Sequence, residues 1–133
     1  MSIEEYFHAG PGYNPFLCRQ DWQVAQLNFL PLFSAPNIRR VERHAATDEA
    51  FILVRGASVL VAANELPDGL VFEAHAMKAG VTYNIPLGVW HTIAMQPDDL
   101  VIVVEKAATH LNDVTYRNLS EAEYLALQKA ITA

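Results

Sequence analysis

Hydrophobic residues in this chain come in short runs of about strand length, separated by glycine, proline and aspartate. Runs of this kind, bounded by turn residues, are typical of β-strands. The pattern predicts strands at residues 23–30, 37–43, 50–54, 58–63, 70–77, 83–85, 91–95 and 100–106. Many short strands at near-regular spacing predict a sandwich or a closed barrel, so we expect an all-β fold.

The two ends of the chain depart from this pattern. Residues 1–21 are rich in glycine, proline and aromatic residues, which predicts an irregular N-terminal arm. Residues 22–109 hold the predicted strands and form the predicted barrel. In the C-terminal segment, 110–133, Ser120 and Glu123 have the spacing of a capping box, and apolar positions follow them. We therefore expect one domain that ends in a short α-helix at about 120–132, packed outside the barrel.

Composition limits the partners and the chemistry. The 133 residues suffice for one hydrophobic core, and the net charge of −6 argues against binding to nucleic acid. No apolar run is long enough to cross a membrane, and the N-terminus lacks a signal peptide, so we expect a cytoplasmic protein.

Cys18 is the single cysteine, so a metal site would have to use histidine and carboxylate ligands. A small molecule is the expected partner.

The most specific local motif surrounds His91. Gly80 is followed after five residues by Pro86 and Gly88, and His91 comes three residues later. Proline presets φ and glycine tolerates a tight turn, so together they fix the direction of the histidine that enters the next strand. A second group of spaced residues consists of Glu42, His44, Glu49 and Gly56.

These two groups resemble the two conserved motifs of the cupin superfamily over roughly residues 36–105. His44, Glu49 and Gly56 match the second histidine, the glutamate and the closing glycine of the first cupin motif. Glu42 stands where that motif has its first histidine, Pro36 replaces its leading glycine, and Met95 replaces the last asparagine of the second motif. The resemblance implies a jelly-roll barrel, or double-stranded β-helix, with the motif side chains facing its interior.

The resemblance also implies a metal site. In cupins the matching residues bind a metal, so His44, Glu49 and His91 are candidate ligands for a divalent iron, manganese, zinc or nickel ion. Glu42 shares a strand face with His44 and is a candidate fourth ligand or general base. Glu42 and His91 are the candidate catalytic residues.

Three further residues are candidates for ligand binding. Arg40 shares the parity of Glu42, so it could pair with Glu42 or hold a ligand carboxylate or phosphate. Tyr83 and Trp90 flank the second motif and could line a cavity. The other histidines, at positions 8, 75 and 110, are expected on the surface.

Two functional hypotheses from different classes stay open. The first is a metal-dependent enzyme of the dioxygenase, isomerase or lyase type, and the second is a metal-free cupin that binds a small molecule without catalysis. A weaker third is an isomerase that uses His44 or His91 as base and Tyr83 as acid. Cupins commonly dimerise, and the aromatic segment 13–16 could cover the sheet edge of a neighbour, so a homodimer is expected.

Overall fold

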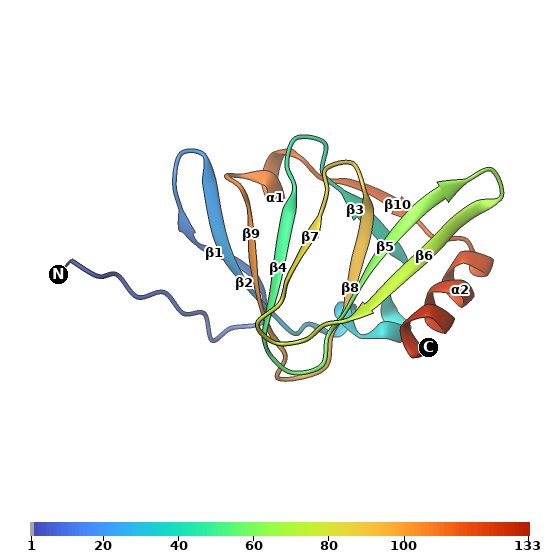
Figure 1. Ribbon diagram of the computed structural model, residues 1–133, viewed down its shortest axis with the longest axis horizontal. Helices are drawn as coiled ribbons and strands as arrows, with labels where there is room; N and C mark the ends of the chain where they lie inside the picture. Colours follow the sequence, from blue (N-terminus) through green and yellow to red (C-terminus); the bar gives the residue numbers. More distant parts are fainter. Residues whose placement is uncertain (1) are drawn as a thin grey trace.

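The computed structural model describes residues 2–133 and consists of two five-stranded antiparallel sheets that face each other (Figure 1). The first sheet has the strand order β1-β2-β9-β4-β7 and the second the order β10-β3-β8-β5-β6. The strands are β1 (Gly12–Cys18), β2 (Trp22–Asn28), β3 (Arg40–Arg43), β4 (Glu49–Arg55), β5 (Val59–Leu66), β6 (Gly69–Ala76), β7 (Thr82–Ile85), β8 (Trp90–Ala94), β9 (Leu100–Lys106) and β10 (Thr115–Asn118). Within residues 2–133 no hydrogen-bonded strand pair joins one sheet to the other, so the barrel is not closed by hydrogen bonds.

The main core fills the space between the two sheets. Side chains alternate between the two faces of a strand, so every second residue points inward. Phe51 and Leu53 of β4, Val103 of β9, and Ile93 of β8 belong to this buried cluster. The all-β jelly-roll class predicted from the sequence is therefore confirmed.

A second core lies on the outer face of the β10-β3-β8-β5-β6 sheet, under the helix α2 (Glu121–Thr132) (Figure 1). The hydroxyl of Ser120 accepts a hydrogen bond from the backbone of Glu123, whose carboxylate accepts one from the backbone of Ser120. Leu127 of this helix is fully buried against Val61 of β5. The capping box, and the helix predicted from it, are both present.

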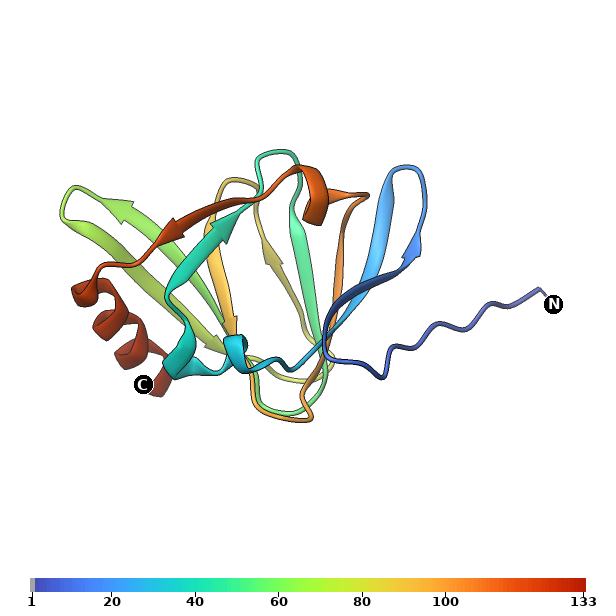
Figure 2. The same ribbon diagram turned by 180° about the vertical axis from the view of Figure 1, so that it is seen from behind.

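The structure adds elements at the two ends that the hydrophobic pattern did not predict. Strand β1 lies within the predicted arm, where Pro15 and a register shift between Asn14 and Leu17 hide its alternation. Strand β10 and the short helix α1 (Thr109–Asn112) follow β9, and β10 pairs with β3 (Figure 2). The strand predicted at 37–43 begins only at Arg40, because residues Ala35–Asn37 form a 3-10 turn that contains Pro36.

None of the helices in residues 2–133 has the length and apolar character that crossing a membrane requires.

Candidate functional site

A cavity of about 480 Å³ opens between the two sheets. One part of its wall is apolar and includes Leu27, Phe33, Ile38, Phe51 and Ile93. The remaining wall carries ionisable and polar side chains, among them Arg40, Glu42, His44, Glu49, His91, Glu105, Tyr13 and His110. The volume falls within the range of small-molecule pockets, and so does the mixture of an apolar wall with a few polar groups.

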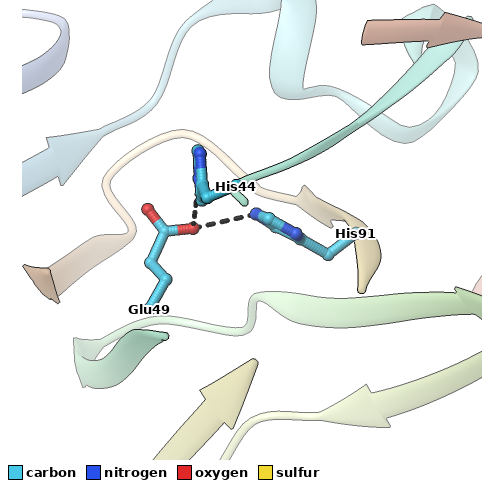
Figure 3. Close-up of side chains that lie close together, drawn as sticks. All are labelled: His44, Glu49 and His91. Atoms are coloured by element: carbon cyan, nitrogen blue, oxygen red, sulfur yellow. Dashed lines mark hydrogen bonds and ion pairs between the residues drawn. The ribbon is translucent and has the colours of Figure 1, made fainter. Parts of the chain in front are cut away.

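His44, Glu49 and His91 converge at the polar end of this cavity (Figure 3). His44 follows β3, Glu49 begins β4, and His91 lies in β8. One carboxylate oxygen, Oε1 of Glu49, lies 3.3 Å from Nε2 of His44 and 2.8 Å from Nε2 of His91. The three residues are 5%, 6% and 2% exposed, so water does not screen these charges.

Main-chain carbonyls hold both imidazole rings in place. Nδ1 of His44 lies 2.6 Å from the carbonyl oxygen of Asp113, and Nδ1 of His91 lies 3.0 Å from that of Val89. A carbonyl can only accept, so each Nδ1 carries the proton and donates it. In a neutral ring, the lone pair of Nε2 would then face the negatively charged Glu49 carboxylate, which is repulsive. Each ring must therefore either carry a second proton, on Nε2, or bind a cation through Nε2.

In the absence of a cation, both histidines favour the protonated form. Burial acts to lower the pKa of His44, but the hydrogen bond and charge of Glu49 and the Asp113 carbonyl raise it to about 9. The pKa of His91 is also raised, because the Glu49 carboxylate outweighs the effect of burial. The pKa of Glu49 is lowered despite burial, since both histidines donate to it. Glu49 therefore carries the negative charge of the cluster.

The same three side chains fit a metal ion. Their ligand atoms all lie within 4.8 Å of one another, and they form the one such group found among residues 2–133. Bonds from a divalent metal to imidazole nitrogen or carboxylate oxygen are about 2.1 Å long, which places neighbouring ligand atoms about 3.0 to 3.4 Å apart. The two Glu49 distances, 2.8 and 3.3 Å, are close to this range. The carbonyls that hold each Nδ1 are the outer contacts that metal-binding histidines ordinarily have.

A second buried carboxyl lies next to the cluster, and sequence reasoning missed it. Glu105 of β9 is the cross-strand neighbour of Glu49. Its Oε1 accepts hydrogen bonds from the hydroxyl of Tyr13 at 2.5 Å and from the amide of Gln23 at 3.2 Å. Its Oε2 is buried and has no hydrogen-bond partner among residues 2–133. Burial and the adjacent Glu49 carboxyl raise the pKa of Glu105 to about 8, so Glu105 is mostly protonated at neutral pH.

His110 joins the same network, although it was expected on the surface. The side-chain oxygen of Gln23 accepts from the backbone N–H of Ala108, which fixes the orientation of the amide. The amide nitrogen therefore donates toward Nδ1 of His110, at 3.1 Å. His110 is half-buried and lines the cavity, because the turn after β9 and helix α1 bring it back over the barrel.

The remaining candidate residues divide into two groups. Glu42 pairs with His91 across β3 and β8 and lines the cavity, and burial raises the pKa of its carboxyl. Glu42 is not a member of the three-residue ligand group. Arg40 also lines the cavity, with its guanidinium stacked 3.7 Å from the ring of Tyr116.

Tyr83 and Trp90 lie outside the cavity lining. Trp90 has the opposite parity to His91, so it faces the outer core and donates from its indole nitrogen to Glu65. The hydroxyl of Tyr83 accepts from the backbone N–H of Lys78. The structure therefore does not bring Tyr83 together with His44 and His91, as the acid–base isomerase hypothesis requires.

Solved structures similar to this chain come from several organisms. A cupin-like protein from Thermotoga maritima is 22% identical, with 84% of this chain and 74% of that one covered and a TM-score of 0.51. The protein BH2720 from Bacillus halodurans is 16% identical, with coverage of 81% and 78% and a TM-score of 0.54. Pac13, described as a unique nucleoside dehydratase, is 13% identical, with coverage of 80% and 77% and a TM-score of 0.52. No family model and no curated protein matches the sequence.

At such identities the likeness shows the fold alone. The two facing sheets and these neighbours establish that the chain has the fold of the cupin superfamily, as the two sequence motifs predicted. Inside that fold lie two histidines and a glutamate that could hold a metal ion.

Proposed function

We propose that this chain is a metal-dependent cupin enzyme that binds a small organic molecule in its cavity. His44, Glu49 and His91 would hold a divalent iron, manganese, zinc or nickel ion. Such an ion supplies Lewis-acid chemistry or activates O₂ when it is bound. The apolar wall excludes water from one side of the ligand, and Glu42 is the candidate group for moving a proton.

One observation carries the proposal. Two buried imidazoles are fixed through Nδ1 so that both Nε2 atoms meet a single carboxylate oxygen. A cluster that served only to fill the core would need no such shared orientation. The raised pKa of Glu42 supports its role, because a carboxyl that titrates nearer neutral pH is a better proton-transfer group than an ordinary glutamate.

Metal content and metal affinity test the proposal. Protein purified without chelator should contain about one transition-metal ion per chain by elemental analysis. His91→Ala should lower this content and weaken binding in titration calorimetry by at least tenfold. His75→Ala is the matched control, because His75 pairs with Glu73 at the exposed surface. Absence of metal from the purified protein, together with no uptake on titration, would refute the proposal.

A metal-free binding protein is the second candidate, and one observation favours it. With both histidines protonated, each Nε2–H already has a hydrogen-bond acceptor in the Glu49 carboxylate, so the cluster needs no metal to complete it. On this hypothesis, ligand binding measured by calorimetry is unchanged by chelator. A loss of ligand affinity on chelation contradicts it and supports the metal-dependent function.

A further inference from the structure

We infer that the ligand of this cavity carries a carboxylate and that Arg40 binds it. The inference rests on the proposed function, since it concerns the ligand of the same cavity. It names a chemical class that the fold does not specify.

Arg40 is exposed at the wall of the cavity, and its guanidinium has no ion-pair partner in residues 2–133. Its guanidinium stacks on the ring of Tyr116, which orders the side chain and leaves the edge of the guanidinium free to donate. No carboxylate of residues 2–133 lies within ion-pair distance of it. Glu42 lies two residues further along the same strand and on the same face. It therefore does not form the ion pair with Arg40 that the sequence analysis allowed. In the part of the chain that the structure describes, residues 2–133, none of the five N–H groups of Arg40 donates to another residue, so in the free protein they face solvent.

The neighbouring arginine of the cavity differs in this respect. Arg39 also lines the cavity and stacks on an aromatic ring, that of Tyr124, but its guanidinium pairs with Glu121 at 3.1 Å. Arg40 is therefore the arginine of the cavity lining that keeps its donors available. A planar fork of N–H groups matches a carboxylate, to which it can donate two parallel hydrogen bonds.

The single free guanidinium of Arg40 matches a carboxylate better than a phosphate monoester. His44 and His91 direct their Nε2 atoms at Glu49 and Arg39 pairs with Glu121, so Arg40 is the charged donor of the cavity lining left for a ligand. A phosphate monoester carries close to two negative charges at neutral pH, whereas Arg40 offers one unpaired positive charge. The apolar wall formed by Phe33, Ile38 and Ile93 adds a preference for a hydrocarbon body. The inferred ligand is an organic acid with an apolar body.

Pairs of charged and uncharged probes test this inference. Benzoate, 3-phenylpropanoate and hexanoate are each compared with the matching amide by titration calorimetry, with benzyl phosphate as a further probe. At least one acid should bind roughly tenfold or more tightly than its amide, since a hydrogen bond to a charged group has about that effect. Arg40→Gln should abolish the preference, and Arg40→Lys should keep part of it because the charge remains.

Arg43→Gln is the matched control. Arg43 lies on the same strand and stacks on an aromatic ring, that of Trp90, but it is not part of the cavity lining. This variant should keep the full preference for the acid. The inference is wrong if no acid binds better than its amide, if Arg40→Gln keeps the preference, or if benzyl phosphate binds more tightly than every acid in an Arg40-dependent way.

The same titrations separate this inference from the metal proposal. Each is run with chelator-treated protein and again with protein loaded with zinc or manganese. An Arg40-dependent preference for the acid in both states supports the inference even if the native protein contains no metal. Loss of the preference while the metal content is normal overturns the inference and leaves the metal proposal intact.

Discussion

Replacing Glu49 with glutamine should destabilise the metal-free protein strongly near pH 6. The substitution keeps the size of the side chain and removes the charge that faces both imidazoles. Near pH 6 both histidines are protonated, because the pKa of His44 is raised from 6.5 to about 9 and that of His91 is raised as well. Removing one partner of a buried ion pair costs about 3–5 kcal/mol. The net rise in the His44 pKa, to which the Asp113 carbonyl and Glu42 also contribute, corresponds to roughly 3 kcal/mol, the same order as this range.

The pKa shifts of His44 and Glu49 determine how the stability of the metal-free protein changes with pH. The proton on His44 stabilises the fold fully below pH 6.5, and this contribution is lost as the pH rises through about 9. The lowered pKa of Glu49 stabilises the fold above pH 4.5, and this contribution is lost as the pH falls below that value. The contribution of the His44–Glu49 pair to the stability of the metal-free protein should therefore be largest between about pH 4.5 and 6.5. The cost of Glu49→Gln should shrink toward pH 10, where His44 is neutral in both proteins.

Urea unfolding in the presence of chelator measures this difference. The free energy of unfolding is determined for wild type and Glu49→Gln at pH 6 and pH 10. Glu73→Gln is the control, since it breaks the exposed pair with His75 and should cost less than about 1 kcal/mol. A cost below 1 kcal/mol for Glu49→Gln at pH 6, or an equal cost at both pH values, would refute the assignment of charges in the cluster.

Three other predictions concern parts of the fold that support the site. Gly56→Ala should cost more than about 3 kcal/mol in urea unfolding, because φ is +108° and a Cβ would lie 1.9 Å from Oδ1 of Asp99. Gly80→Ala is the control, because Gly80 has a φ of +84° but no atom within 4 Å of the added Cβ, and it should cost about 1–2 kcal/mol. An equal cost for both would contradict the clash. Tyr13→Phe removes a hydroxyl donor from Glu105 and should lower stability by about 1–3 kcal/mol in thermal unfolding, and an unchanged melting temperature would contradict this. The homodimer expected from the sequence stays a prediction, and light scattering should give twice the mass of one chain.

The residues at the centre of the site could be predicted because local chemistry determines them. The turn from Pro86 to Gly88 fixes the entry of His91 into β8, and the spacing of His44 and Glu49 places one at the end of β3 and the other at the start of β4. Trp90 was expected at the cavity, although strand parity points it to the opposite face from His91. Once the order of the strands is known, no further information is needed to predict that His44, Glu49 and His91 meet.

The outer part of the site depends on pairings that are distant in sequence. Parity along β9 puts Glu105 on the same face as Val103, but only the pairing of β9 with β4 places it beside Glu49. Tyr13 reaches Glu105 from β1, a strand whose register shift removes the alternation that would reveal it. His110 depends on the turn after β9. Such long-range contacts are set by the packing of the two sheets, which no local pattern encodes.

Anomalous diffraction from crystals of metal-loaded protein tests whether His44, Glu49 and His91 hold a metal ion. Data collected at the absorption edge of the bound metal locate the ion independently of its assumed ligands. We expect one strong peak per chain, about 2.0–2.2 Å from Nε2 of His44, Nε2 of His91 and a carboxylate oxygen of Glu49. A peak at any other position, or no peak after soaking with metal, would contradict it.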